Sequence, residues 1–144
     1  MPYPEMLVAP MREDLVRLGF QELRSASEVD DTLQNTPEPV LVVVNSVCGC
    51  AAGAMRPAVA LSLFDESIPR PTKLTTVFAG QDLEATQRAR EYFPGYPPSS
   101  PSIAILKDGG LVWMLERHQI EGRPPQILAA VLRSAYEEHC QSAP

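Results

Sequence analysis

The stretch VLVVVNSVCGCAAGAM, residues 40–55, joins a run of apolar residues to two cysteines that a single glycine separates. The apolar run at 40–45 follows the proline-containing segment TPEP, which is typical of a short strand buried inside a sheet. Small residues after the cysteines, and the helical spacing of the larger apolar residues beyond them, predict a helix that reaches Phe64. Cys48 is therefore expected at the junction of a strand and a helix.

Patterns before this junction predict helices and one short strand. Pro10 is compatible with the start of a second helix, and Gly19 closes the first segment. Residues 20–23 are typical of a short strand, and Ser25 with Glu28 resembles the capping box of a helix that ends before TPEP. The first segment has four apolar residues at the spacing of one helix face, namely Leu7, Met11, Leu15 and Leu18.

Patterns after the junction predict three more strands and two more helices. Asp108-Gly109 is a strong signal for a tight hairpin between the last two strands, and Pro124 with Pro125 opens a closing helix. The predicted segments are a strand at 73–78, a polar-faced helix at 81–93 with Asp82 near its start, a proline-rich loop at 95–101, and strands at 102–108 and 110–116. The closing helix places its apolar residues on one side, at Ile127, Leu128, Val131, Leu132 and Ala135.

The order of these elements predicts an α/β fold in which helices cover a mixed sheet. A right-handed crossover makes the strands at 20–23 and 40–45 parallel. Cys48 then lies just past the carboxyl end of a strand, where open α/β sheets place their sites. No repeat or linker divides the chain, so we expect one domain over residues 1–144, of a size that buries about two thirds of its unfolded surface.

Composition excludes several classes of function. The net charge of -6 offers nucleic acid no basic surface, and the apolar stretch at 40–44 is far shorter than the roughly 20 residues that span a bilayer. Three cysteines do not form the disulfide framework of a small secreted domain, and no charged-then-apolar leader precedes them. We therefore expect a cytoplasmic protein with reduced cysteines that binds neither nucleic acid nor membrane.

The position of Cys48 favours thiol chemistry. The first amide hydrogens of a helix have no partner within it, and together with the helix dipole they stabilise a thiolate. Cys50 lies further into the helix and is expected to be less exposed. A disulfide between the two requires Cys48 to lie outside the helix and Gly49 to bend freely, and such a bridge is expected to be strained and easily reduced.

Other interpretations of these residues remain open at this point. The two cysteines are also compatible with small buried apolar side chains, or with a metal site that adds His139 and Cys140. The predicted closing helix argues against a metal site, because it places His139 and Cys140 about 20 Å away from the junction. Cys140 is then expected near a frayed end of the chain. His118 either tunes a thiolate or is a solvated loop residue, and Asn45 and Ser46 either donate hydrogen bonds to the thiolate or end the strand.

Nearly the whole chain resembles the bacilliredoxin family of bacterial thioredoxin-like proteins. The segments that carry the resemblance are MPYPEMLVAPMREDLVRLGFQEL, VNSVCGCAAG, YFPGYPPSSPSIAIL and ERHQIEGRPPQIL. The resemblance implies a three-layer thioredoxin-like fold with an N-terminal helical extension, and a cis proline at Pro101 facing the reactive cysteine. It also implies that Pro57 kinks the helix that contains it.

The activity that the resemblance implies is removal of bacillithiol, or a similar low-molecular-weight thiol, from mixed disulfides on oxidised client proteins. The expected catalytic residues are Cys48, which attacks, Cys50, which resolves the adduct, and Pro101. No bound cofactor or metal is expected, and bacillithiol serves as co-substrate. Two alternatives stand beside this hypothesis: a protein disulfide isomerase or general disulfide reductase, and a non-catalytic module that binds a metal or a partner through the cysteine loop.

Overall fold

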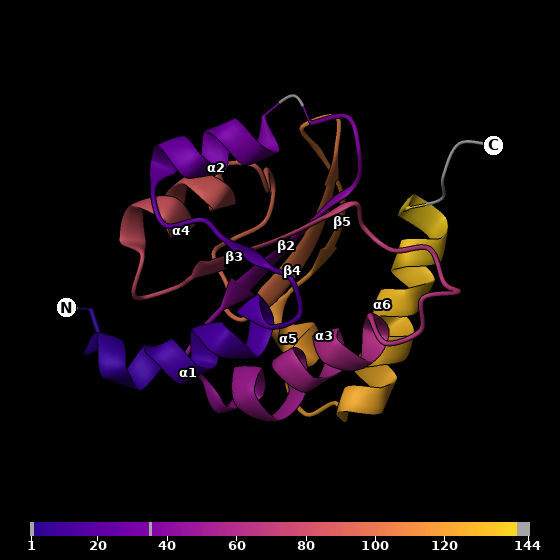
Figure 1. The fold of residues 1–144 in the computed structure, drawn as a ribbon, viewed down its shortest axis with the longest axis horizontal. Coiled ribbons are helices and arrows are strands. Elements are labelled where there is room, and N and C mark those ends of the chain that lie inside the picture. The colour runs from indigo at the N-terminus through magenta and orange to yellow at the C-terminus, as the bar shows by residue number, and fades with distance from the viewer. Residues whose placement is uncertain (1, 35, 141–144) are drawn as a thin grey trace.

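The protein is described by a computed structural model over residues 2–34 and 36–140, and Figure 1 shows the order of its elements. The strands are β1 (Gln21–Glu22), β2 (Val40–Asn45), β3 (Lys73–Phe78), β4 (Ser102–Lys107) and β5 (Gly110–Leu115). The helices are α1 (Glu5–Val16), α2 (Ala26–Leu33), the π-helical segment η1 (Ala51–Met55), α3 (Arg56–Ser62), α4 (Leu83–Arg90), α5 (Arg117–Ile120) and α6 (Pro125–His139).

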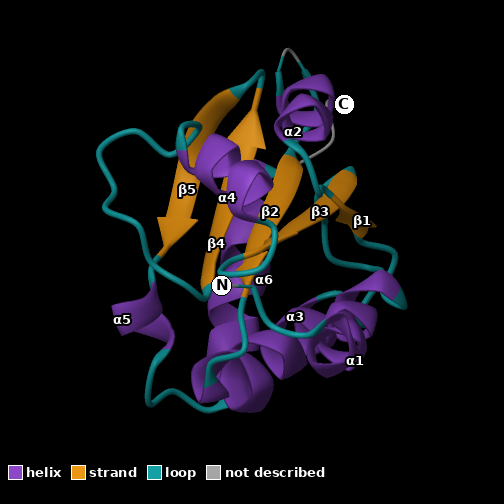
Figure 2. Cartoon of the chain, turned by 90° about the vertical axis from the view of Figure 1, so that its left-hand side faces the viewer, coloured by secondary structure: helices purple, strands orange, loops and turns teal. Residues whose placement is uncertain are grey.

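The five strands form one mixed sheet in the order β1-β3-β2-β4-β5. The strands β1, β3 and β2 are parallel, whereas β4 runs antiparallel to β2, and β5 antiparallel to β4. The predicted parallel direction of β1 and β2 is thus confirmed, although β3 lies between them. Figure 2 shows β2 to β5 side by side, with α1, α3 and α5 at one end of the sheet.

Helices cover both faces of the sheet, as the predicted three-layer arrangement requires. Successive residues of β2 point to opposite faces, and all six are buried. Leu41 and Val43 pack in a core with η1, α3 and α6, while Val42 and Val44 pack in a second core with α2 and α4. Figure 1 shows α2 and α4 together, apart from α3 and α6. Burial on both faces explains why β2 reads as an unbroken apolar run.

The N-terminal segment is one helix, so the second start suggested by Pro10 is wrong. Pro10 lies inside α1, where a proline removes one N–H from the helix ladder. The predicted apolar face is also shifted, because Leu7 is exposed while Arg12 is buried beside Leu15. The helix ends before Gly19, whose positive φ of 100° closes the turn as expected.

The helix after the cysteines is less regular than its sequence predicts. It begins at Gly49, directly after Cys48 at the predicted junction, but residues 51–55 form the π-turn η1, in which the N–H of Arg56 donates to the carbonyl of Ala51. Pro57 has no N–H to donate and follows this wide turn directly, in the first turn of α3. The π-turn is therefore an irregularity that was not predicted, and it lies just before Pro57, where a kink was expected. Helix α3 ends at Ser62 instead of Phe64.

The second half of the chain follows the prediction closely. Asp108 and Gly109 have positive φ angles of 55° and 75° and form the hairpin between β4 and β5. Helix α6 opens at Pro125, although Ile127, expected on its apolar side, is exposed. The short helix α5 was not predicted. None of the helices in the described ranges is both long and apolar enough to cross a bilayer.

Arg12 ties α1 to the rest of the fold. Its buried guanidinium binds Glu5 at 2.7 Å within α1, Glu22 of β1 at 3.1 Å, and Asp82 before α4 at 2.7 Å. It also lies 5.3 Å from the ring centroid of Phe78 in β3. Three carboxylates around one partly desolvated cation make this cluster a structural ion-pair network, in which each member depends on the others.

Replacement of Arg12 by methionine should lower the free energy of unfolding, measured in urea at neutral pH, by about 2 kcal/mol or more. The cause is Asp82, whose side chain is only 10% exposed and would lose its nearest cation. Adding Asp82→Asn should recover part of the loss. Arg17→Met is the matched control and should cost less than about 0.5 kcal/mol, because the Arg17 side chain is 63% exposed and Asp14 is its only ion-pair partner in the described part of the chain. Equal losses for the two arginines would contradict this account.

Candidate active site

The end of β2 is held by a buried polar cluster that fixes the loop before the cysteines. The side-chain amide of Asn45 donates to the carbonyl of Met11 in α1 at 3.0 Å. Its oxygen accepts from the backbone N–H of Ser46 and from the guanidinium of Arg56, both at 2.9 Å. Arg56 also donates to the carbonyl of Ser46 at 3.1 Å and pairs with Asp14 at 3.1 Å. The cluster joins α1, β2 and α3 below the reactive loop.

Asn45 and Ser46 act on the loop and not on the sulfur. The hydroxyl oxygen of Ser46 accepts a hydrogen bond from the backbone N–H of Cys48 at 3.2 Å. Within the described chain, the hydrogen bonds of the Asn45 side chain all go to Met11, Ser46 and Arg56. Neither residue therefore donates to the thiol, and both instead set the backbone from which Cys48 projects.

The two cysteines lie at the start of the helix, with Cys48 outside it. The backbone N–H of Cys50 donates to the sulfur of Cys48 at 3.3 Å, and the N–H groups of Ala51 and Ala52 donate to the carbonyl of Cys48. Both thiols are partly exposed, so the expected difference in exposure is not pronounced. They differ in their surroundings, because Cys50 packs against the core that η1, α3 and α6 share.

The surroundings move the pKa values of the two thiols in opposite directions. Burial alone would raise the pKa of Cys48, but hydrogen bonds from the Cys50 thiol and amide, the charge of Arg117 and the amide of Ala51 together lower it. The pKa of Cys50 is raised, first by its hydrogen bond to Cys48, then by burial and by the charge of Cys48. Cys48 is therefore the thiol that ionises first.

Cys48 opens into a cavity of about 530 Å³ that lies beside the carboxyl end of β2. Its lining includes Ser46, Arg90, Ser100 and Arg117, whereas Cys50 does not line it. The Ser100–Pro101 peptide bond is cis, as the family resemblance implied, and Pro101 itself is buried. Segments far apart in the sequence thus meet at the Cys48 thiol.

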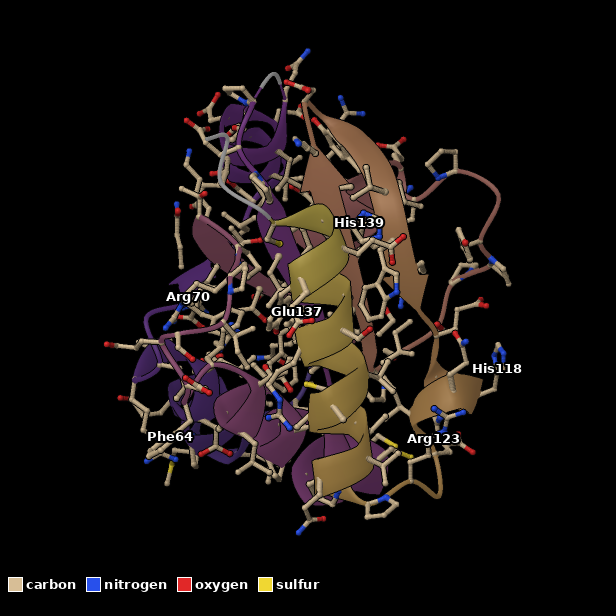
Figure 3. The ribbon with its side chains drawn as sticks, turned by 90° about the vertical axis from the view of Figure 1, so that its right-hand side faces the viewer. Phe64, Arg70, His118, Arg123, Glu137 and His139 are labelled. Atoms are coloured by element: carbon tan, nitrogen blue, oxygen red, sulfur yellow. The ribbon has the colours of Figure 1, made fainter. Side chains whose placement is uncertain are left out.

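Arg117 is placed at the cavity by the start of α5. Glu116 and Gln119 form a capping box, in which the side chain of Gln119 accepts from the N–H of Glu116 at 2.9 Å. The Arg117 guanidinium pairs with Glu121 and donates to the carbonyl of Ser100 at 3.3 Å. Its neighbour His118, which the sequence left open as a candidate, is 74% exposed and points away from the body of the protein in Figure 3. His118 does not line the Cys48 cavity.

Cys140 and His139 lie apart from the two motif cysteines. Figure 3 shows His139 at the end of α6 opposite Arg123. Cys140 is not at a frayed position as predicted, because it is buried against the core, and burial raises the pKa of its thiol to about 11. Within residues 2–34 and 36–140 no three His, Cys, Asp or Glu side chains gather in a way that could hold a metal ion.

Three arginines at this site escaped the sequence analysis as candidates. Arg56 is the one charge in the apolar run AAGAMRPAVALSL, and this contrast was a usable signal of a buried role. Arg117 lies directly before His118, and only His118 was considered as a candidate. Arg90 belongs to the polar segment QRARE, which has the composition of a solvated helix face and gives no sign of the cavity.

Comparison with known proteins agrees with this geometry. A family model described as "Disulphide isomerase" matches residues 3–140. A bacilliredoxin of Koribacter versatilis is 52% identical over 96% of this chain and 94% of its own length. A bacilliredoxin of Bacillus cereus is 53% identical over 94% of this chain and 92% of its own length. Relatives this similar over this length share the family as well as the fold.

Solved structures support the fold alone, because their sequences are distant. Thioredoxin of Malassezia sympodialis superposes with a TM-score of 0.57 at 14% identity, over 85% of this chain and 91% of its own. Thioredoxin of Fasciola hepatica gives a TM-score of 0.55 at 16% identity, over 83% of this chain and 99% of its own. With curated relatives at about half identity along almost its full length, the chain belongs to the bacilliredoxin family and is a thiol-disulfide oxidoreductase of thioredoxin-like fold.

Proposed function

We propose that this oxidoreductase removes bacillithiol, or a similar low-molecular-weight thiol, from mixed disulfides on client proteins. The observation that carries the proposal is the unequal placement of the two thiols: Cys48 lines the cavity, while Cys50 lies behind it against the core. A cavity of this volume suits a small molecule attached to the sulfur under attack. The names of the curated relatives favour the same activity.

In the first step the Cys48 thiolate attacks the sulfur of the small thiol. A disulfide forms between Cys48 and the small thiol, the original disulfide breaks, and its electron pair leaves on the client cysteine as a thiolate. The lowered pKa of Cys48 supplies the attacking species near neutral pH. Pro101 belongs to the proposed site through Ser100, the residue before it, which lines the cavity.

In the second step Cys50 resolves the adduct. Its thiolate attacks the sulfur of Cys48, an internal disulfide forms, and the small thiol leaves with the electron pair. A second small thiol can instead attack the adduct, restoring the Cys48 thiolate and leaving a small symmetric disulfide. The raised pKa of Cys50 keeps it protonated until Cys48 no longer carries a charge beside it. All three cysteines are free in the structure, and we place the reaction in the cytoplasm, where thiols are kept reduced.

A second candidate function is isomerisation or general reduction of protein disulfides. The description of the matching family model favours it, and the same pair of thiols could perform it. The two functions differ in the group that occupies the cavity during attack. A client peptide carrying bacillithiol should therefore be cleaved faster than the same peptide in a disulfide with a second peptide, and the reverse order would favour the isomerase.

Replacement of Cys48 or of Cys50 by alanine should separate the two steps of the reaction. Cys50→Ala should still strip the small thiol from a client peptide but stop with that thiol bound to Cys48, while Cys48→Ala should be inactive. Intact-mass measurement after mixing with the modified peptide distinguishes these outcomes. Cys140→Ala is the control and should turn over normally, because Cys140 is buried away from the cavity. An adduct on Cys50 in the Cys48→Ala protein would reverse the assigned roles.

The charge of Arg117 should be visible in the pH dependence of Cys48 alkylation. Cys48 should be labelled before Cys50 and Cys140 by a limiting amount of iodoacetamide near neutral pH, as peptide mapping can show. Because Arg117 lowers the pKa of Cys48, Arg117→Gln should move the midpoint of the rate profile to higher pH. The variant should be slower below the midpoint and should match the parent well above it, where the thiol is ionised in both proteins.

His118→Gln is the matched control for this experiment, because His118 follows Arg117 directly but does not line the cavity. Its rate profile should overlay that of the parent protein. A shift of similar size in both variants would mean that net charge in this region, and not the placed guanidinium of Arg117, sets the pKa of Cys48.

A further inference from the structure

The Cys48 cavity has a charge opposite to that of the whole chain. Aspartate and glutamate together outnumber lysine and arginine by 18 to 12, giving a net charge of -6. The described residues that line the cavity nevertheless include two arginines, Arg90 and Arg117, and no aspartate or glutamate. A concave site with two cations and no carboxylate attracts anions, and its partly enclosed walls strengthen that attraction.

Arg90 is the more unusual of the two arginines. It is half-buried at the last residue of α4, and the one hydrogen bond of its side chain within the described chain runs from Nη2 to the carbonyl of Ser99 at 3.4 Å. Its Nε is buried with no described partner, and burial lowers its pKa. Arg88, two residues earlier, instead pairs with Asp30 at 2.8 Å and with Glu91 at 2.7 Å. A partly desolvated guanidinium with one long hydrogen bond lacks the anion that usually offsets such a charge.

Arg117 lines the same cavity and is fixed to the same segment. It donates to the carbonyl of Ser100, while Arg90 donates to the carbonyl of Ser99. Ser99–Ser100 therefore holds both guanidinium groups beside Cys48. Glu121 takes the Nε of Arg117, and the Nε of Arg90 is buried, so the Nη groups of the two arginines are the donors that a ligand in the cavity can use. Planar guanidinium forks match the geometry of carboxylates better than a point charge does.

We infer that the cavity between Arg90 and Arg117 binds a carboxylate of the low-molecular-weight thiol whose sulfur Cys48 attacks. This inference rests on the proposed function and narrows its substrates to acidic thiols. The carboxylate takes no part in bond exchange; it holds the small thiol so that its sulfur, and not the client sulfur, faces Cys48. Arg90 and Arg117 are thus specificity residues, and a thiol that carries only an amine is disfavoured by repulsion.

Simple disulfides that differ in charge test this inference directly. The Cys50→Ala protein, which retains the adduct, should be mixed separately with dithiodipropionate, which is acidic, with hydroxyethyl disulfide, which is neutral, and with cystamine, which is cationic. The rate of adduct formation on Cys48 is measured by intact mass and divided by the rate at which the same disulfide is reduced by dithiothreitol, a neutral thiol that differs from the thiol halves of all three disulfides. We expect the normalised rate to be about tenfold higher for the acidic than for the neutral disulfide, and lowest for cystamine.

Variants of the two arginines should abolish this preference. The ratio of acidic to neutral rates should fall close to one in Arg90→Gln and in Arg117→Gln. Because the same Cys48 attacks both disulfides, a change in its pKa largely cancels from the ratio. Arg90→Lys keeps the charge but loses the planar guanidinium, so its ratio of acidic to neutral rates should lie between those of the parent and of Arg90→Gln. Lys73→Gln is the control, since Lys73 begins β3 at the end of the sheet opposite Asn45, and it should keep the full ratio.

A measurement on the parent protein tests the carboxylate site without relying on the correct folding of a variant. Relative to free cysteine, Cys48 should react with iodoacetate faster than with iodoacetamide. A ratio near one in both assays, or a ratio that Arg90→Gln leaves unchanged, would overturn the carboxylate site. The proposed function fails in a different way: Cys48 would then form no adduct with any of the three disulfides.

Discussion

The buried hydrogen bond from Arg56 to Asn45 is the constraint on which the reactive end of the molecule depends. Asn45 is the last residue of a strand that is buried on both faces, so its amide would be costly to leave unpaired. It is satisfied by Met11, Ser46 and Arg56, which belong to three different parts of the chain. The same contacts position Ser46, whose hydroxyl accepts from the amide of Cys48. The same hydrogen bonds therefore fix both the packing at the end of β2 and the position of the Cys48 thiol.

The arginines of this protein divide by what surrounds them. Arg12 and Arg56 are buried, have carboxylate partners and connect elements of the fold. Arg90 and Arg117 border the cavity at Cys48, whose described lining includes no aspartate or glutamate, although Arg117 also pairs with Glu121 outside that lining. An acidic protein thus keeps a local positive field where a thiolate must form and where an acidic substrate is proposed to bind. The field acts on the nucleophile through Arg117, and on the ligand through both arginines.

Local patterns predicted the elements better than their arrangement. The strand at 40–45 could be predicted because burial on both faces leaves an unbroken apolar run. Asp108-Gly109 indicated the hairpin between β4 and β5, because few residues accept a positive φ. The insertion of β3 between β1 and β2 leaves no local pattern, because strand pairing is long-range. Burial of Arg12 was missed for a related reason: its three carboxylate partners come from separate segments.

Some residues of the candidate site could likewise be predicted from local sequence patterns, whereas others are brought together only by the fold. The junction of β2 with a helix located Cys48 and Cys50, and resemblance to the family added Pro101, whose cis peptide bond is confirmed. Their catalytic roles stay predictions. Arg90 and Arg117 reach one cavity from segments 27 positions apart in numbering, and only the folded chain brings them together. The wide turn η1 was hidden for another reason, since the small residues AAGAM fit an α-turn and a π-turn equally well.

That wide turn lets the spacing of the cysteines vary independently of the core. A π-turn holds one residue more than an α-turn, and a Cys-x-Cys motif holds one residue fewer than Cys-x-x-Cys. The two differences cancel between Cys48 and Arg56. The number of residues between the end of β2 and the start of α3 is therefore the same as in a chain that has two residues between its cysteines and a regular α-helix after them. A chain that gained one residue between its thiols could lose it again by closing η1 to an ordinary turn. Redox chemistry can diverge at one end of such a helix while the other end keeps its register.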